Sequence, residues 1–468
     1  MTKPVRIASI LLAVLVCLAA LSALLLSRVD PKPLFEAVAS EATGLEATVN
    51  GSVSVRLFPT PKMRLRQLTL RNQQAQIASV GTADVGVAWW PLLRRRVRIT
   101  RLALHDLNVE IERDRKGRFN FAKPPSAKPP VPAMSLGRVS ITKASFRYTN
   151  RQSDKEVKAT DCSVDSDAFR LGRGDRADIM KNLSLTAHVV CAELRNDLFV
   201  GTDVDFEIQG ERGRFDFAPW TMRILGGKGA GTVLADFTGT MPAYRVRYAV
   251  TRLHVNDLFG SLASGKAGEG FLDFSADLSM HGFDADEWTR TARGEASLHG
   301  ENLELAIGDL DHKLDRYESS QNFNLVDVGA FFIAGPLGTV VTKGYDFATI
   351  FRGAQGSTHV RRLLSHWRVE HGIAHAKDVA MATRENRLVL KGALDFVHRE
   401  FDEVTVAFVD DRGCALVEQK IVGPFSEPDV QDPNVLIAMI GPVTSLIGKM
   451  KKMVGMECEV LYEGSIAP

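Results

Sequence analysis

Alternating apolar and polar residues dominate the chain from about Thr48 onward. Val53, Val55 and Leu57 alternate with polar neighbours, which is the pattern of a strand with one buried face. The same period of two returns in further stretches separated by turn residues, namely 102–111, 183–189, 204–208 and 244–250. This repetition predicts a mainly β fold whose body is an antiparallel sheet.

The phase of the alternation changes once within the stretch 102–111. Leu102 and Leu104 are followed by Leu107, Val109 and Ile111, so the apolar positions shift by one residue. A shift of one residue would turn the apolar side chains to the opposite face. The sequence therefore predicts a bulge or bend between Leu104 and Leu107.

A few segments have helical spacing instead. One short helix is expected over 33–43, ending at Gly44, and a group of amphipathic helices is expected in an insert over 306–364. An amphipathic helix over 443–454, with lysines on one face, is expected before a terminal strand over 458–462. Aromatic residues of the insert are candidates for a groove lining or plug: Phe331, Phe332, Phe347 and Phe351.

A short motif is repeated within the β-rich part of the chain. Residues 270–274 and 392–396 share a Gly-x-Leu-Asp-Phe pattern, and 234–237 is a looser copy. Repeated strand units predict an elongated or duplicated sheet.

The stretch from Ile7 to Leu26 contains no charged residue. A helix of this length spans roughly the ~30 Å hydrocarbon core of a bilayer, so a single transmembrane helix is expected here. Lys3 and Arg6 precede it, which favours a cytoplasmic N-terminus. The alternative is a cleaved signal peptide, but the run is longer than a usual signal core and no clear small-residue cleavage site follows. Both readings predict export of the remaining chain.

These features give an expected domain organisation. A Pro-rich stretch over 123–133 cannot enter a central strand or a helix, and it reads as a linker. The expected order is an anchor, an N-terminal helix and β unit, this linker, a β-rich body that contains the insert, and a C-terminal segment: 1–30, 31–122, 123–133, 134–434 and 435–468.

Composition and charge exclude some classes of function. The 58 Lys and Arg residues nearly balance the 56 Asp and Glu residues, so no broad positive field exists to bind nucleic acid. Neither a nucleophile elbow nor a phosphate-binding glycine loop occurs. His366, His371 and His375 cluster in sequence, but strand geometry does not bring three ligands together, and a zinc site needs at least three. We therefore expect no enzyme activity, and no catalytic, cofactor-binding or metal-binding residue.

Four cysteines lie outside the apolar run, an even number that agrees with export. Three pairings are open, and proximity in the sequence favours Cys162 with Cys191 and Cys414 with Cys458. Four buried free thiols are the alternative.

The order of several short motifs along the chain resembles the AsmA family of bacterial envelope proteins. In the N-terminal part these motifs follow the apolar run: Ala42-Thr43-Gly44, Asn50-Gly51-Ser52-Val53, Phe58-Pro59-Thr60-Pro61, Trp89-Trp90-Pro91-Leu92-Leu93 and the turn 114–120. Later motifs are Gly229-Ala230-Gly231-Thr232, Val255-Asn256-Asp257-Leu258-Phe259, the repeated Gly-x-Leu-Asp-Phe units and 422–428.

The resemblance implies a single-pass inner-membrane protein with a periplasmic β-rich body and a groove for lipid acyl chains. Its implied role is outer-membrane or envelope biogenesis, with membrane phospholipid as the partner. The alternation itself fits two arrangements equally: two sheets that cover each other, or one curved sheet with an open apolar trough. The resemblance favours the trough and therefore lipid binding or transfer. The alternative function is a scaffold or assembly factor for outer-membrane proteins, which would bind a protein partner and no lipid.

Overall fold

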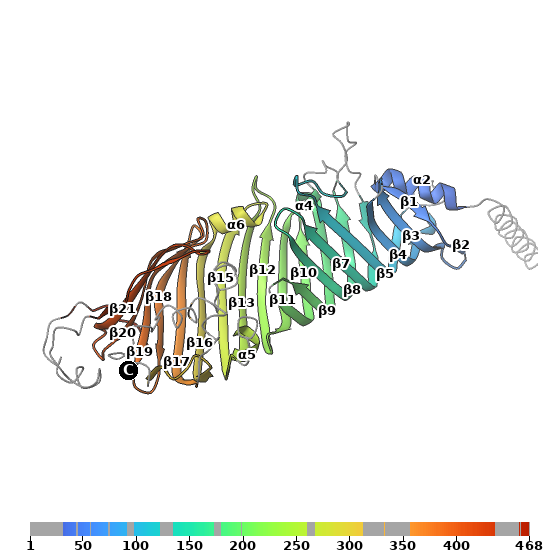
Figure 1. The fold of residues 1–468 in the computed structure, drawn as a ribbon. Helices are drawn as coiled ribbons and strands as arrows, with labels where there is room; N and C mark the ends of the chain where they lie inside the picture. Colours follow the sequence, from blue (N-terminus) through green and yellow to red (C-terminus); the bar gives the residue numbers. More distant parts are fainter. Residues whose placement is uncertain are drawn as a thin grey trace, which may run out of the picture. The chain divides into compact units, whose positions relative to one another are not determined.

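A computed structural model describes most of the chain after the uncharged N-terminal run (Figure 1). The described residues are 31–43, 45–56, 58–73, 75–90, 98–121, 134–172, 179–197, 199–259, 267–311, 332, 356–435, 458 and 460–467. The expected anchor from Ile7 to Leu26, the linker over 123–133 and the helix over 443–454 all lie outside these residues. Within the described residues, no helix has the length and hydrophobicity needed to cross a bilayer.

The chain forms two compact units, and both are mainly β, as the alternation predicted. Unit 1 contains residues 1–197 together with 208–211, and unit 2 contains residues 198–207 together with 212–468. Strand β10 (Val200–Glu211) is divided between them.

Within its described residues, unit 1 contains nine strands and two helices. The strands are β1 (Glu46–Val49), β2 (Val53–Arg56), β3 (Lys62–Asn72), β4 (Ala75–Val87), β5 (Ile99–Arg113), β6 (Met134–Leu136), β7 (Arg138–Asn150), β8 (Lys155–Leu171) and β9 (Leu183–Asn196). The helices are α2 (Pro31–Thr43) and α4 (Ile179–Asn182). The helix expected over 33–43 is thus confirmed as α2.

Neighbouring strands of unit 1 are antiparallel with one exception. Strands β1 and β2 both pair with β3, and the order then continues through β4 and β5. Strand β7 runs parallel to β5 and antiparallel to β8, which pairs with β9 and, at its far end, with β6. The sheet is therefore mostly antiparallel, as expected, with this one parallel pair. A parallel pair needs a long crossover, and the chain between β5 and β7 supplies one.

The edge of unit 1 is covered by α2. The Glu36 carboxylate accepts a hydrogen bond from the Val49 amide at 2.7 Å, and the Ser40 hydroxyl accepts one from the Ala47 amide at 2.9 Å. Glu36 and Ser40 are four residues apart and therefore lie on one face of the helix. Together they satisfy two amides of edge strand β1 that would otherwise be open to pairing with another chain.

Unit 2 is a meander of hairpins in which each long strand pairs antiparallel with the next. Its long strands after β10 are β11 (Arg214–Ile224), β12 (Gly227–Asp236), β13 (Ala243–His254), β15 (Phe271–His281), β16 (Arg293–Leu305), β17 (Thr358–Glu370), β18 (Ile373–Ala382), β19 (Arg387–Asp395), β20 (Glu400–Val409) and β21 (Ala415–Pro424).

Shorter elements complete unit 2. Strand β14 (Gly268–Glu269) pairs with β16, and β22 (Asp429–Val430) and β23 (Asn434–Val435) pair with β21. The helices are α5 (Val255–Phe259) and α6 (Ala285–Thr291). Residues 358–364, which we expected at the end of the helical insert, are the first residues of β17. In place of the expected terminal strand over 458–462, Val460 forms a single bridge with Cys414.

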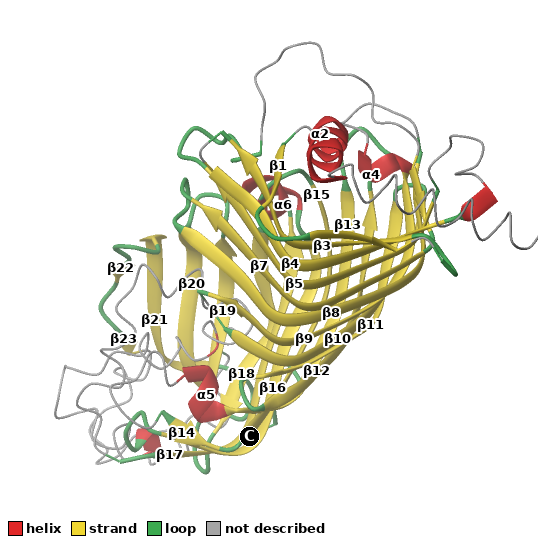
Figure 2. Cartoon of the chain, turned by 90° about the vertical axis from the view of Figure 1, so that its right-hand side faces the viewer, coloured by secondary structure: helices red, strands yellow, loops and turns green. Residues whose placement is uncertain are grey.

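The strands of unit 1 bend at residues in the left-handed backbone region. Gln67 on β3, Asp106 on β5 and Lys143 on β7 have φ values of 56°, 55° and 52°. The strand registers align them with one another across Gly81 of β4. Each is exposed and follows another exposed residue, so the apolar side chains before and after it stay on one face. The bend predicted between Leu104 and Leu107 is therefore confirmed, and Figure 2 shows these strands curved along their length.

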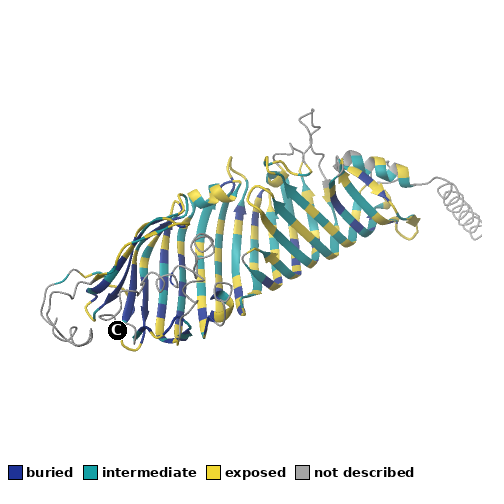
Figure 3. Cartoon of the chain, viewed as in Figure 1, coloured by how far each residue is buried: buried dark blue, intermediate teal, exposed yellow. Residues whose placement is uncertain are grey.

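The largest hydrophobic core lies in unit 2. It joins buried residues of β13 to β21 with α5 and with Leu310 and Phe332. A smaller cluster covers the opposite face of β18 to β20, where Tyr462 and Ile466 pack against Ala380 and Ala407. The C-terminal part of unit 2 is thus buried on both faces, as the many dark positions from β16 to β21 in Figure 3 show.

Candidate functional site

One face of the unit 1 sheet is apolar across seven strands. The strand registers place seven apolar residues in a single row, from β2 to β9: Val53, Leu65, Ala83, Leu104, Ile141, Val164 and Val189. A second row repeats the pattern: Ala47, Leu70, Ala78, Val109, Phe146, Ala159 and Leu194. We call this surface the apolar face of unit 1.

Unit 2 has an equivalent apolar face. Its central row crosses β11, β12, β13, β15, β16, β17 and β18 as Trp220, Gly231, Tyr248, Ala276, Ala296, Trp367 and Ala376. Phe206, Phe217 and Trp220 form an aromatic group near the start of this row, with the Phe206 and Trp220 rings 5.2 Å apart. No charged residue interrupts the row.

Burial along the unit 2 row increases toward the C-terminal strands. Trp220, Tyr248 and Ala276 are only partly buried, whereas Ala296 is 3% exposed and Trp367 is fully buried. The apolar face is therefore accessible over β11 to β15 and closed from β16 onward by the core that contains α5, Leu310 and Phe332. The unit 1 face is also largely half-exposed, and Phe146 on β7 is 38% exposed.

Tyr248 illustrates how apolar this surface is. Its ring lies directly against the glycines of β12. A Cβ atom at Gly229 would lie only 2.2 Å from the Tyr248 hydroxyl oxygen, so a larger residue would not fit there. Burial raises the pKa of Tyr248 to about 12, since the phenolate would lose hydration there. The Tyr248 hydroxyl and the Trp220 indole nitrogen are buried without a hydrogen-bond partner among the described residues.

The opposite face of unit 2 is charged. Next to the central row, the registers place Arg247, Asp277, Glu295, Arg368 and His375 in line across β13 to β18. Arg245 and Arg247 both contact Asp277 at 3.0 Å. The hydrogen bond from Arg245 is the main reason that the pKa of Asp277 lies below its usual value. The sheet therefore has one face for water and one for apolar groups.

The apolar faces decide between the two arrangements that the sequence left open, a sandwich of two sheets and a single curved sheet. Among the described residues, no second sheet packs on the apolar face of either unit. The accessible parts of both faces belong to single curved sheets, which is the trough arrangement and not the sandwich.

A shallow hollow of about 380 Å³ lies on the charged face of unit 2. Its floor is formed by small residues such as Ala249, Ser275 and Ser297, with Arg247 and His366 at its sides. The charged and hydroxyl groups around it are already paired, for example Ser275 with Ser297 at 2.9 Å and His366 with Glu295 at 3.6 Å. We therefore place the candidate site on the apolar faces.

Only Phe332, of the four aromatic residues predicted to line or plug a groove, lies within the described residues. Its side chain is fully buried in the core that closes the unit 2 face. Its carbonyl oxygen accepts a hydrogen bond from the Ser365 hydroxyl at 2.7 Å, and Ser365 accepts one from the Trp367 indole at 2.7 Å. The roles of Phe331, Phe347 and Phe351 stay predictions, because these residues lie outside the described part of the chain.

The structure contains two disulfides, one in each unit. Cys162 pairs with Cys191 across β8 and β9, and Cys414 pairs with Cys458 near the chain end. This is the pairing that sequence proximity favoured. Cys162 and Cys191 are both buried, and they lie in neighbouring strands opposite each other.

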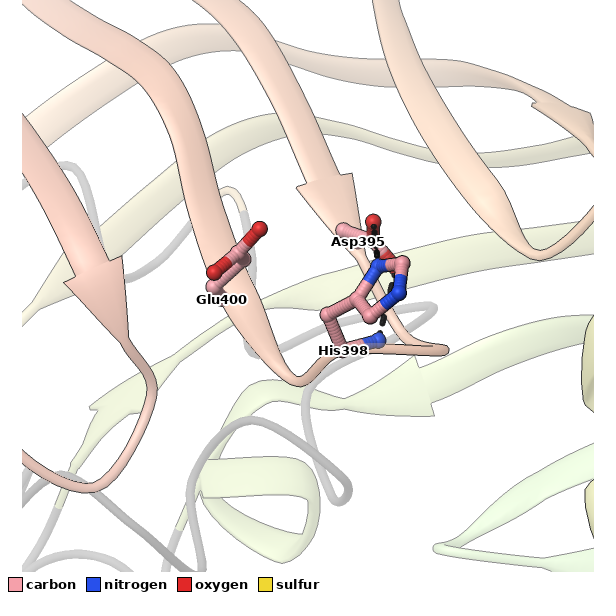
Figure 4. A group of neighbouring side chains, drawn as sticks. All are labelled: Asp395, His398 and Glu400. Atoms are coloured by element: carbon pink, nitrogen blue, oxygen red, sulfur yellow. Dashed lines mark hydrogen bonds and ion pairs between the residues drawn. The ribbon is translucent and has the colours of Figure 1, made fainter.

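The predicted histidine cluster is not brought together as a metal site. His366 lies on the charged face of β17 near Glu295, His371 is in the β17–β18 turn, and His375 is on β18. The one group of potential ligands found within the described residues is Asp395, His398 and Glu400, which the sequence did not indicate (Figure 4).

The contacts of Asp395 show that its carboxylate stabilises the hairpin turn between β19 and β20. Its Oδ2 lies 2.7 Å from His398 Nδ1, and its Oδ1 accepts hydrogen bonds from the Val397 and His398 amides. Burial alone would raise the pKa of Asp395, but these hydrogen bonds hold it below its usual value. Both carboxylate oxygens thus close the turn between β19 and β20.

Sequence reasoning missed the apolar face where it crosses β11. The alternation there changes phase between Phe217 and Trp220, at a bulge that contains Pro219. A proline within an alternating segment was the available signal, because proline in a sheet marks an edge or a bulge.

Comparison with known proteins supports the family inferred from the sequence. The sequence model of the AsmA family matches residues 1–179, which cover most of unit 1. No curated protein and no solved structure matches the chain. Over residues 1–179, the chain is therefore similar to the AsmA family.

Proposed function

We propose that this chain is a non-enzymatic envelope protein, anchored in the inner membrane, that binds or transfers phospholipid acyl chains on its apolar faces. The observation that carries the proposal is the accessible apolar surface of a single curved sheet, exemplified by the partly buried row Trp220, Tyr248 and Ala276. The match of residues 1–179 to the AsmA family is compatible with a role in envelope biogenesis or lipid transport.

The location in the proposal rests on three features. The uncharged run from Ile7 to Leu26 has the length of a transmembrane helix. The two disulfides fit an oxidising compartment such as the periplasm. The family is one of envelope proteins, so an inner-membrane anchor with a periplasmic body is the arrangement that joins these features.

Acyl chains fit the apolar faces for an energetic reason. Removing a methylene group from water contributes about 0.8 kcal/mol, so a chain lying on these rows gains several kcal/mol while its head group stays hydrated. A water-soluble ligand would gain nothing from such a surface. No charged group of the central rows would need to be desolvated.

The test is co-purification of phospholipid with full-length protein in mild detergent, compared between two variants. Ala276→Glu adds a carboxylate to the apolar face of β15, and Ser275→Glu adds the same group to the charged face one residue earlier. We expect A276E to retain at most about half of the lipid bound by the wild type, because a carboxylate on this face disfavours acyl chains while the apolar face of unit 1 is unchanged. S275E should retain the wild-type amount.

Mass spectrometry of the extracted lipid gives the readout. Equal lipid content in the wild type and both variants, at the level of an unrelated membrane protein, would contradict the proposal.

The alternative function, a scaffold for outer-membrane proteins, predicts a crosslinked protein partner whose capture is unaffected by A276E.

A further inference from the structure

Three exposed aromatic side chains gather at one corner of unit 1. Phe58 is 82% exposed, Trp90 is 78% exposed and Trp89 is 37% exposed. Phe58 lies in the turn between β2 and β3, whereas Trp89 and Trp90 follow the end of β4. We call these three residues the aromatic corner.

Backbone and side-chain hydrogen bonds hold the two segments of the aromatic corner together. The Trp89 indole donates to the Pro59 carbonyl at 2.9 Å. The Val87 amide donates to the Pro61 carbonyl at 3.0 Å, and the Ala88 amide donates to the Arg98 carbonyl at 3.0 Å. The aromatic corner is therefore a fixed feature of the fold and not a chance exposure of two separate loops.

Packing within the chain does not account for this exposure. None of the three residues belongs to the hydrophobic clusters found among the described residues. Tryptophan and phenylalanine exposed side by side lose the free energy that burial of their rings would provide. Such residues are enriched where a protein meets the boundary between lipid head groups and acyl chains.

The charges beside the aromatic corner have the sign that favours an anionic membrane. Arg56, Lys62 and Arg98 are exposed around it, and the nearby carboxylate of Asp84 is bound by Arg64 at 2.6 Å. Aromatic residues among basic residues are typical of segments that lie in the membrane interface.

The length of the chain keeps the aromatic corner close to the membrane. Four residues separate Leu26, the end of the uncharged run, from Pro31, the first residue of α2. A fully extended chain spans at most about 3.6 Å per residue, so α2 begins within about 18 Å of the end of that run. Figure 1 shows the start of α2 and strand β2 at the same end of unit 1.

We propose that the aromatic corner binds unit 1 to the anionic head-group layer of the membrane that holds its N-terminal anchor. We call this contact between the aromatic corner and the membrane the seat. This inference rests on the membrane anchorage in the proposed function. Phe58, Trp89 and Trp90 insert at the boundary between head groups and acyl chains, while the neighbouring arginines and lysine contact lipid phosphates. The seat fixes the edge of the unit 1 sheet next to the lipid layer.

Tryptophan fluorescence of the full-length protein tests the seat. The protein is reconstituted in vesicles of phosphatidylethanolamine and phosphatidylglycerol that contain phospholipid brominated either near the head group or near the chain end. We expect shallow bromines to quench more strongly than deep ones, and the double variant W89F/W90F to lose about half of the quenchable emission, because these tryptophans lie at the interface.

Trp288→Phe is the matched control. Trp288 is a partly exposed tryptophan of α6 in unit 2, and its replacement should leave the shallow quenching unchanged. A second variant, Phe58→Ser, should weaken quenching of Trp89 and Trp90 without changing the fold, whereas F283S, at a residue 67% exposed in unit 2, should not.

The outcomes separate the seat from the proposed function. Unchanged shallow quenching in W89F/W90F overturns the seat, as does capture of a protein partner at the aromatic corner in place of lipid. Phospholipid bound to the apolar faces is measured separately, by extraction from the same protein variants purified in mild detergent. Its loss with intact quenching would contradict lipid binding on those faces and support the seat.

Discussion

At the scale of single residues, curvature depends on a few side chains held in an unfavourable backbone region. Gln67, Asp106 and Lys143 adopt φ values near +55° in the middle of long strands, where residues other than glycine are uncommon. Because the strand registers align them, their bends add up across the sheet of unit 1. The left-handed conformation at each of these three residues costs conformational energy. In return, the apolar face of unit 1 is curved.

Lys143 offers a direct test of this cost. Its side chain is exposed, so substitutions there act through the backbone. Lys143→Gly should leave stability unchanged or raise it by about 0.5 kcal/mol, and Lys143→Val should lower it by about 1–2 kcal/mol, since a β-branched residue disfavours the left-handed region. Thermal unfolding midpoints of the two full-length variants measure the difference. Equal midpoints would show that Lys143 does not hold this conformation in solution.

Neighbouring residues also show what can be read from a sequence. The change of phase between Leu104 and Leu107 predicted a bend, because side-chain direction alternates locally along a strand. The alignment of that bend with Gln67 and Lys143 could not be predicted, because it depends on which strands pair and in which register.

At the scale of elements, the C-terminal segment Tyr462–Ile466 acts as a clamp on β18 to β20. The Tyr462 hydroxyl donates to Asp378 at 2.5 Å, and the Ser465 amide donates to the same carboxylate at 2.8 Å. Arg387 donates to the Ile466 carbonyl at 2.9 Å. The clamp lies on the face opposite the closed core, so it stabilises the end of unit 2 where both faces are buried.

The clamp should depend on the charge of Asp378. Burial alone would raise the pKa of Asp378, but hydrogen bonds from Tyr462 and Ser465 outweigh it and lower that pKa. A lowered pKa means that the stabilisation is complete above the unfolded value of about 3.9 and is lost as pH falls through the folded value. Protection of the Ile466 amide against hydrogen exchange should therefore stay constant from about pH 8 to pH 5 and decline below about pH 4.

Asp378→Asn tests the same clamp at neutral pH. The neutral amide accepts weaker hydrogen bonds, so local protection at Ser465 and Ile466 should fall by about 1–2 kcal/mol. Protection of β12 and β13 serves as the internal control, because these strands do not contact the clamp. Unchanged exchange at Ser465 would mean that Asp378 does not hold the segment.

The secondary-structure elements could be predicted from the sequence, but their long-range pairing could not. Helix α2 and the alternating strands were predictable, because their patterns are local. The parallel pairing of β5 with β7 and the docking of Tyr462 beside Asp378 join residues far apart in sequence, and no local pattern encodes them. The disulfide pairing was favoured correctly because the partners of each pair are near each other in sequence; Cys162 and Cys191 also lie in the neighbouring strands β8 and β9.

At the scale of the whole molecule, our proposal depends on which part of the apolar surface remains uncovered. The sequence predicted faces of this kind but not where they are open, because coverage depends on long-range packing such as that of Leu310 and Phe332. Each unit keeps an accessible apolar surface within a chain of nearly balanced charge. In our proposal these surfaces carry acyl chains, and the anchor and aromatic corner bring unit 1 to the lipid.

Photo-crosslinking in living cells tests this account most directly. A benzophenone amino acid replaces Phe146, on the apolar face of β7, or Arg147, the next residue on the opposite face. After irradiation, the intact protein is purified and its mass is measured. We predict a phospholipid adduct at position 146 and none at position 147. Adducts of equal yield at both positions, or a protein adduct in place of lipid at position 146, would contradict the proposed function.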